Sequence, residues 1–479
     1  MGKLTIANLK KTLYYLKRNG LRNTWNAARE RLAAVEPYEP KIFTEDELLA
    51  MRLETAGWIA ESDASGRSMP FFSILVPAYR TDSRFLRELV ESVQAQVYPK
   101  WELLILDASE DESVREALER ICDAAKLKLW ITNETDTGEG GVRYVRLAEN
   151  AGISENTNAG LPYVTGDYVG LLDHDDVLTP DALYEMTLAI CGEDAPTVLY
   201  SDEDKWDGEG KYYERNRKED FNLDLLLSNN YVCHFLVMKT ELFRELKLRK
   251  EYDGAQDYDL VLRAAAWIMK QGRMPENEIR HVPEVLYHWR CHGGSTAENP
   301  QSKLYAYEAG RRALQDFSDG QGWKAKAVDL KHLGFYRLRH EGTQETLLEE
   351  RKDLGAIGGK ILSKGAIAGG RMAEDGSIYY EGLNENYSGY MHRAVLTQDA
   401  EAADLRCICV AKELWPLFEE IVGVPYVTRR IDLKEERGAE IFDAGTLPEG
   451  ADVKALSLAF SKALRERGKR ILWDPELAI

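Results

Sequence analysis

The fold is decided by the stretch Tyr168-Val169-Gly170-Leu171-Leu172-Asp173-His174-Asp175-Asp176. Its apolar first half, bounded by Gly166-Asp167 and Thr179-Pro180, predicts a buried strand that ends at a cluster of carboxylates. Because three acids within four residues repel one another, a cation or hydrogen-bond donors are expected between them. Oxygen ligands favour Mg²⁺ or Mn²⁺, so the cluster predicts a divalent-metal site.

An alternative interpretation assigns these acids to the start of the next helix. Asp is common at helix N-termini, and Pro180 and Asp181 are suited to a first helical turn. One acid would suffice for that role, so the metal site remains the preferred hypothesis.

Strands and helices alternate around this stretch from residue 71 onward. The residue patterns predict strands at 71–76, 101–106, 142–147, 167–172, 197–200 and 282–287, with helices between several of them. Such alternation is typical of an α/β fold with a mainly parallel sheet that is covered by helices on both faces. Ligands of these sheets bind beyond the carboxyl ends of the strands. Polar loops follow four of the strands and are expected to converge on one crevice: 77–79, 107–109, 150–152 and 173–175.

The loop after the first strand excludes two common nucleotide sites. A dinucleotide fold would require GxGxxG there, and a P-loop would require GxxxxGK[ST]. Residues 77–82 read Pro-Ala-Tyr-Arg-Thr-Asp and fit neither pattern.

Two later segments carry further polar side chains. Asp257 and Asp259 lie where a helix with apolar positions at 260–262 is expected to begin, and His288 to Thr296 follow the last predicted strand. Each also has a structural explanation, since either Asp257 or Asp259 would serve as a helix cap and His288 as a hydrogen-bonded core residue.

Taken in order, these segments resemble a family 2 glycosyltransferase with the GT-A fold over about residues 71–318. The resemblance rests on Ile74 to Tyr79, Asp107 with Ser109, Asn150 to Ser154, Leu172 to Asp176 with Pro180 to Leu183, Gln256 to Leu260, and Tyr287 to Ser295. Within that family the chain is most similar to bacterial enzymes of rhamnan, O-antigen and capsule assembly, to which Tyr200 to Lys205 also points.

The resemblance implies an inverting transfer of a sugar from a UDP- or dTDP-sugar to a hydroxyl of a growing surface glycan or a lipid-linked acceptor. It implies that Asp257 is the general base, that Asp175, with Asp173 and His292, holds Mn²⁺ or Mg²⁺, and that the nucleotide-sugar is bound by Pro77, Tyr79, Asp107, Asn150, Gly152, Asp173, His292 and Ser295. The chemistry is consistent, because a cation offsets the charge of the leaving diphosphate and a carboxylate takes the proton of the acceptor hydroxyl.

Two features depart from the family pattern and leave the donor open. The acidic pair often found after the second strand is reduced to Asp107, and the arginine common near the third-strand loop is absent. Arg143, Arg146 and Arg80 are the candidates to supply that charge.

Three domains are expected. Residues 1–70 form a basic helical segment and linker, 71–318 the catalytic GT-A domain, and 330–479 a unit that resembles the later half of a GT-A transferase. Because this last unit has no acid cluster at a strand end, we interpret it as a degenerate, non-catalytic accessory domain.

Composition limits the partners. The net charge of −19 over 479 residues argues against a general nucleic-acid binder. Six scattered cysteines without CxxC spacing indicate neither a zinc site nor a disulfide framework. No apolar run is long enough to span a bilayer and no signal-peptide core is present, so we expect a cytoplasmic protein.

Residues 1–32 stand apart with eight Lys or Arg against one acid. Leucines recur at roughly helical spacing in this segment, which fits either an amphipathic helix at the inner face of an anionic membrane or a helix docked on the protein.

Two other functions fit the sequence less well. A nucleotidyltransferase would require a glycine-rich basic loop after the first strand, and residues 77–82 contain no glycine. A non-catalytic glycan-binding or assembly protein would have no need of the clustered acids Asp173, Asp175 and Asp257.

Overall fold

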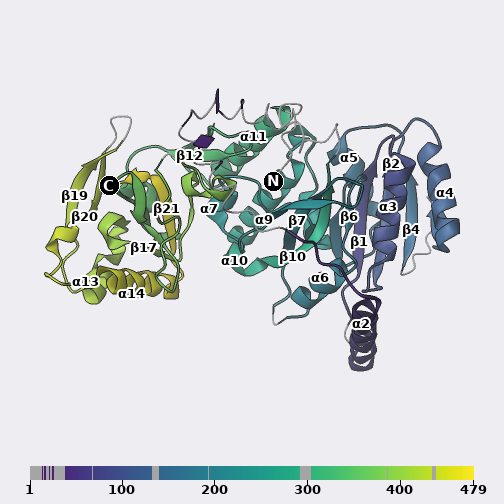
Figure 1. Cartoon of the computed structure of the whole chain (residues 1–479), viewed down its shortest axis with the longest axis horizontal. Coiled ribbons are helices and arrows are strands. Elements are labelled where there is room, and N and C mark those ends of the chain that lie inside the picture. Colours follow the sequence, from purple (N-terminus) through teal and green to yellow (C-terminus); the bar gives the residue numbers. More distant parts are fainter. Residues whose placement is uncertain are drawn as a thin grey trace.

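The computed structural model describes residues 38–66, 68–131, 140–192, 194–291, 304–385, 387–433 and 438–479, together with a few isolated positions before residue 38. The predicted residues His292 and Ser295, and nearly all of the basic segment 1–32, lie outside the described residues. Figure 1 shows a larger unit that contains the first strands and a smaller unit that contains the C-terminus.

A ten-stranded sheet forms the centre of the larger unit in the described part of the chain, in the order β3-β4-β2-β1-β5-β9-β7-β10-β6, with β8 paired to β7. Its strands are β1 (Phe72–Ala78), β2 (Trp101–Asp107), β3 (Leu129–Ile131), β4 (Gly141–Arg146), β5 (Tyr168–Leu171), β6 (Val177–Leu178), β7 (Val198–Trp206), β8 (Tyr212–Asn216), β9 (Leu236–Lys239) and β10 (Ile279–Arg290). The pairs β1–β2, β1–β5, β2–β4, β3–β4 and β7–β10 are parallel. The predicted α/β class with a mainly parallel sheet is confirmed.

The register brings the predicted loops to one edge of this sheet. Ala78 lies opposite Asp107, and Leu75 lies opposite Leu171. Strand β9 was not predicted, and it lies antiparallel between β5 and β7. It is only four residues long, too short for a periodicity signal.

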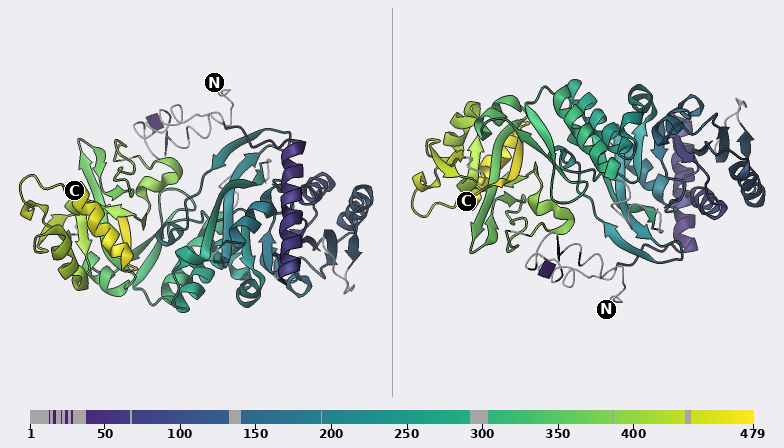
Figure 2. Two further views of the ribbon diagram at one scale, coloured as in Figure 1. Left: turned by 90° about the horizontal axis from the view of Figure 1, so that it is seen from below. Right: turned by 90° about the horizontal axis from the view of Figure 1, so that it is seen from above.

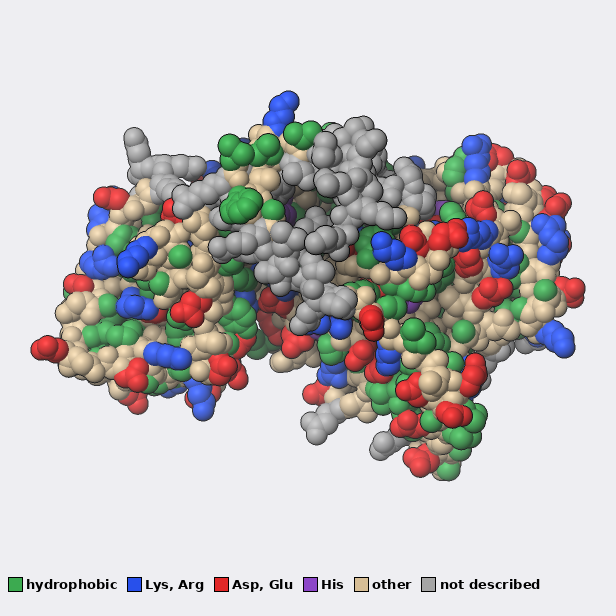
Figure 3. Space-filling model, viewed as in Figure 1, with side chains coloured by type: hydrophobic (Ala, Val, Ile, Leu, Met, Phe, Trp, Pro, Cys, Tyr) green, Lys and Arg blue, Asp and Glu red, His purple; other side chains and the backbone are tan. Residues whose placement is uncertain are grey.

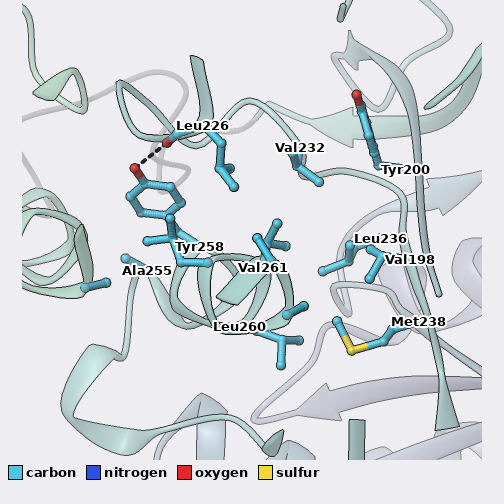
Figure 4. Close-up of a cluster of buried hydrophobic side chains, with 14 of the residues drawn as sticks. Val198, Tyr200, Leu226, Val232, Leu236, Met238, Ala255, Tyr258, Leu260 and Val261 are labelled. Carbon is cyan, nitrogen blue, oxygen red and sulfur yellow. Dashed lines mark hydrogen bonds between the residues drawn. The ribbon is translucent and has the colours of Figure 1, made fainter. Parts of the chain in front are cut away.

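Helices cover both faces of the sheet. Alternate side chains of β1 enter different cores, with Leu75 in one and Ile74 and Val76 in the other. The helices of this unit are α2 (Glu45–Ser65), α3 (Ser83–Gln94), α4 (Ser113–Ala125), α5 (Ile153–Asn158), α6 (Ala182–Ile190), α7 (Leu223–Leu226), α8 (Thr240–Leu246), α9 (Gln256–Lys270), α10 (Pro275–Glu278) and α11 (Leu304–Gly320). Helices α7, α9 and α11 pack on the first core, and α3, α4 and α6 on the second. Figure 4 shows Leu260 and Val261 of α9 facing Leu236 and Met238 of β9.

Helix α2 starts with a capping box at Thr44, whose side chain accepts a hydrogen bond from the Glu47 backbone N–H. Leu48, Met51 and Trp58 pack against the second core. Figure 1 shows α2 standing out from the lower edge of the larger unit, and Figure 2 shows the same helix lengthwise. Segment 38–66 is therefore attached to the larger unit through one face of this helix and through hydrogen bonds from Tyr38 to Asp204 and from Lys41 to Asp181.

The smaller unit has a core of its own, which starts at Leu348. Its elements are α12 (Gln344–Glu350), β13 (Leu354–Ser363), β14 (Ala366–Gly369), β15 (Arg371–Met372), β16 (Gln398–Asp399), β17 (Ala402–Ala403), β18 (Ile408–Val410), α13 (Trp415–Val422), β19 (Thr428–Asp432), β20 (Gly438–Phe442), α14 (Val453–Glu466) and β21 (Arg470–Ala478). The hairpin of β11 (Ala325–Asp329) and β12 (Tyr336–His340) precedes them, and its Ala327 and Tyr336 belong to the first core of the larger unit.

Buried charges join the two units. Asp224 of α7 accepts hydrogen bonds from Arg351 at 2.5 and 3.0 Å and from Arg470 at 2.5 Å. Burial raises the pKa of Asp224, but the two guanidinium groups outweigh it and hold that pKa well below its usual range. The outer surface is different in character, because basic and acidic side chains are interspersed over the face in Figure 3. Among the described helices, none is long and apolar enough to cross a bilayer.

Candidate active site

A pocket of about 910 Å³ lies at the carboxyl edge of β1 and β5. The predicted residues that line it are Pro77, Tyr79, Asn150, Gly152, Asp173, Asp175 and Asp257. Three of the four predicted loops, 77–79, 150–152 and 173–175, therefore converge on the pocket together with Asp257, whereas the loop 107–109 does not line it. Asp107 does not line the pocket.

Asp107 is fully buried below the pocket. Its carboxylate accepts hydrogen bonds from the backbone N–H of Ser109 at 2.9 Å, the Tyr144 hydroxyl at 2.8 Å and the Arg146 guanidinium at 3.2 Å. With three donors already in place, Asp107 joins the ends of β2 and β4. Of the three arginines considered for the missing charge, Arg146 binds Asp107 and Arg80 lines the pocket.

Tyr79 and Arg80 form one side of the pocket mouth. The Tyr79 hydroxyl donates to Glu110 at 2.9 Å, and the Arg80 guanidinium donates to the same carboxylate at 2.9 and 3.0 Å. This contact links the first-strand loop to the second-strand loop and presents an aromatic ring beside a cation.

Position 152 accommodates only glycine. Its φ of +100° is unfavourable for other residues, and a Cβ atom would lie 2.3 Å from Asp253 Oδ2. Asp253 in turn accepts from the backbone N–H of Ser154 at 3.2 Å. The close approach attaches the start of α5 to the loop that precedes α9.

The three acids of the decisive stretch have different environments. Asp173 and Asp175 line the pocket, whereas Asp176 is buried behind them. The Tyr287 hydroxyl donates to Asp176 at 2.5 Å, and the backbone N–H of Arg290 donates to it at 2.7 Å. Burial, together with the charges of Asp175 and Asp173, raises the pKa of Asp176 well above its ordinary value. Asp176 is therefore a structural residue.

The ionised form of Asp173 is less favourable than that of an exposed aspartate. Burial and, to a smaller extent, the neighbouring Asp175 raise the pKa of its carboxyl, while His234 opposes this change. None of the three acids starts the next helix, because α6 begins at Ala182 and Asp181 precedes it.

His234 is the main site residue that the sequence analysis missed. It lines the pocket, and its backbone N–H and ring Nδ1 lie 2.7 and 2.8 Å from Glu203 Oε2. Burial lowers the pKa of His234, but Glu203, Asp173 and Asp176 outweigh it and raise the pKa to about 9. A cationic imidazole therefore faces the acid cluster near neutral pH. The sequence gives little indication of this role for His234, because the residue lies just before strand β9, which was not predicted.

Glu203 is held ionised behind His234. Burial raises its pKa, but Lys218, whose Nζ lies 3.6 Å away with a fully buried side chain, and His234 lower it to about 2. The side chains of His234, Glu203 and Lys218 therefore form a charged row that starts at the pocket wall.

Asp257 and Asp259 have separate roles, although they are two residues apart. Asp257 lines the pocket in the first turn of α9. Asp259 is buried and forms ion pairs with Arg249 and with Arg263, the second at 2.8 Å. Only Asp257 is available to a substrate.

His288 is a hydrogen-bonded core residue, as its structural explanation predicted. Its Nδ1 lies 2.6 Å from Asp204 Oδ1, and Asp204 also accepts from the Tyr38 hydroxyl at 2.6 Å. Neither His288 nor Asp204 lines the pocket.

The donor set of the pocket fits a hard divalent cation. Asp173 and Asp175 supply carboxylate oxygens, and Mg²⁺ in particular is often held by one or two carboxylates with waters and substrate phosphates. Among the described residues, no group of three or more His, Cys, Asp and Glu side chains forms a complete metal site. A cation held by these two carboxylates would take its remaining ligands from water and substrate phosphates.

Comparison with known proteins agrees with this fold. Residues 73–247 match the model of glycosyl transferase family 2. Residues 73–247 of the chain are therefore similar to the glycosyltransferases of family 2.

Two curated relatives extend this likeness. The chain is 36% identical over 267 residues to the uncharacterized protein y4gI of Sinorhizobium fredii, covering 55% of this chain and 27% of that protein. It is 33% identical over 272 residues to the O-antigen biosynthesis protein RfbC of Myxococcus xanthus, covering 57% of this chain and 20% of that protein. The chain thus spans only a small part of the length of either relative.

Among solved structures, a mannosyltransferase from Pyrobaculum calidifontis in complex with GDP-Man and Mn²⁺ aligns with a TM-score of 0.36 at 15% identity, covering 57% of this chain and 85% of that one.

Proposed function

We propose that this chain transfers a sugar from a nucleoside diphosphate sugar to a hydroxyl group of a bacterial surface glycan or its lipid-linked precursor, with inversion at the anomeric carbon. The observation that carries the proposal is the meeting of Asp173, Asp175 and Asp257 in one pocket. A metal-binding carboxylate pair and a separate carboxylate base are the two parts that such a transfer requires.

The donor end of the pocket is assigned to the loops after β1, β4 and β5. Pro77 and Tyr79 offer an apolar and aromatic surface to a base, and Arg80 offers a cation to a phosphate. Asn150 and Gly152 line the adjacent wall. The likeness to the O-antigen biosynthesis protein supports a glycan as the product class.

At the acceptor end, Asp257 is assigned the role of general base. It accepts the proton of the acceptor hydroxyl while the oxygen attacks the anomeric carbon from the face opposite the diphosphate. A divalent cation held by Asp173 and Asp175 supplies positive charge beside the leaving diphosphate when it is bound. The His234 cation lies on the same side and adds to that charge.

A donor screen tests the proposal. The full chain is incubated with UDP-, dTDP- and GDP-sugars and either Mn²⁺, Mg²⁺ or EDTA, and the released nucleoside diphosphate is measured. We expect release with one donor class and a divalent cation, and none with EDTA. Retention of the anomeric configuration in the product, determined by proton NMR, would contradict inversion. Tight donor binding without release in the presence of glycan acceptors would favour a non-catalytic binding protein.

A further inference from the structure

Asn230 contacts the proposed base. It belongs to the segment between α7 and β9, and its Nδ2 donates a hydrogen bond to Asp257 Oδ2 at 2.9 Å. Both side chains line the pocket. The same Nδ2 lies 3.3 Å from the Cys233 thiol, which also hydrogen-bonds to Asp257. One short segment therefore supplies two donors to this carboxylate.

The orientation of the Asn230 amide is determined by its neighbours. The amide oxygen would repel a carboxylate, so the NH₂ group has to face Asp257. This leaves Oδ1 of Asn230 buried and without a hydrogen-bond partner among the described residues. A buried polar atom without a partner is unfavourable for stability, and such atoms are often retained for a functional reason.

The position of Asp257 explains why a donor is needed. An aspartate in the first helical turn is attracted to the free backbone N–H groups of that turn. The residue before α9, Ala255, has no side chain that caps these groups. Without an external donor the carboxylate would be drawn towards the helix end, and Asn230 provides that donor from the pocket side.

We propose that Asn230 is a positioning residue that holds the Asp257 carboxylate towards the acceptor hydroxyl. The inference rests on the proposed function. In the transfer, the acceptor O–H bond breaks and its proton moves to Asp257. The oxygen forms a bond to the anomeric carbon, and the bond to the diphosphate breaks with its electron pair on the leaving oxygen.

The first test measures Asp257 without any substrate. Other titratable groups that face it are the Cys233 thiol, Asp173 and the Tyr336 hydroxyl. The full chain is labelled with [4-¹³C]aspartate, the Asp257 signal is assigned with Asp257→Asn, and its carboxyl chemical shift is recorded at neutral pH. We expect Asn230→Ala to change this chemical shift, because the carboxylate loses a hydrogen-bond donor.

Asn230→Asp is the second variant, and its nearly unchanged shape favours folding. It replaces a donor by a second carboxylate, so the Asp257 signal should move at least as far as in Asn230→Ala. Asn229→Ala is the matched control, since Asn229 lies in the same segment but does not line the pocket. An unchanged Asp257 chemical shift in both Asn230 variants, or an equal change in the Asn229 variant, would overturn the inference.

The second test measures turnover with the donor found in the screen. Asn230→Ala should reduce kcat about tenfold or more, with the KM for the donor nearly unchanged, because the amide acts through the base. Loss of donor binding would overturn the positioning role. If the wild-type chain releases no nucleoside diphosphate, the proposed function fails, and the carboxyl chemical shift still decides whether Asn230 positions Asp257.

Discussion

The backbone N–H of Arg290 donates a hydrogen bond to the Asp176 carboxylate at 2.7 Å. The Arg290 side chain also donates from Nε to the carbonyl oxygen of Asp175 and from Nη2 to Glu88 at 2.6 Å. Its guanidinium lies over the rings of Phe85 and Trp206 at 4.5 and 4.0 Å. One buried arginine at the end of β10 thus sets the shape of the acid loop that begins more than a hundred residues earlier in the chain.

Replacement of Arg290 by alanine should lower the free energy of unfolding by about 3–5 kcal/mol, because it leaves Glu88 without its buried partner and removes packing on two rings. Urea denaturation followed by fluorescence measures this. The control is Arg84→Ala, a half-exposed arginine that also pairs with Glu88 and should cost about 1 kcal/mol or less. Equal losses for the two variants would contradict the role of Arg290.

Asp175→Asn should abolish most metal-dependent binding of the nucleoside diphosphate, since the amide keeps the shape of the side chain but removes an anionic ligand. Calorimetry with the donor's nucleoside diphosphate, with Mn²⁺ and then with EDTA, measures the effect. Asp63→Asn, on the exposed side of α2, serves as the control and should bind as the wild type does. Equal affinity of the wild-type chain in Mn²⁺ and in EDTA would argue against the metal assignment.

Asp257→Asn should leave donor affinity nearly unchanged and reduce turnover by roughly 10² to 10⁴, the usual scale for the loss of a general base. Asp259→Asn, two residues away, should instead lower the melting temperature, because Arg249 and Arg263 lose their buried partner. Nucleoside diphosphate release and thermal unfolding are measured for both variants. The assignment is wrong if the two variants exchange these phenotypes.

The pair of His234 and Glu203 predicts a decline in stability at alkaline pH. The folded pKa of His234, about 9, exceeds its ordinary value near 6.5, so the native state binds the extra proton more tightly. The resulting stabilisation is complete below about pH 6.5 and is lost as the pH rises through about 9, and it amounts to at most about 3 kcal/mol. Unfolding free energies between pH 6 and 9.5 test this. His234→Gln should remove that part of the slope, and an identical slope in both proteins would contradict it.

Asp224→Ala should destabilise the contact between the two units by about 3–5 kcal/mol, because the buried guanidinium groups of Arg351 and Arg470 lose a carboxylate partner. Calorimetry should show the smaller unit unfolding at a lower temperature than the larger one. Asp443→Ala, which removes an exposed turn carboxylate in the smaller unit, is the control and should leave both transitions in place.

The sequence predicted the main elements of the catalytic domain well. The strands at 71–76, 101–106 and 142–147 appear within two residues of their expected bounds, because buried parallel strands are continuous apolar runs between polar loops. Strand β7 extends to Trp206, whereas the sequence predicted an end near residue 200. The prediction ended too early because the outer half of the strand, including Asp202, Glu203 and Asp204, is polar. Those acids are buried by partners that periodicity does not reveal.

Sequence alone determined the fold class and predicted that polar side chains gather at the carboxyl edge of the sheet, because apolar runs and strand-end loops are local features of the chain. Tertiary structure decided how each acid is used. Of Asp173, Asp175 and Asp176, only the first two line the pocket, and of Asp257 and Asp259, only the first does. His234 was recognised only through Glu203, thirty-one residues earlier in the chain. The exposure and charge of a polar side chain depend on partners distant in sequence, and those partners are set only when the chain has packed.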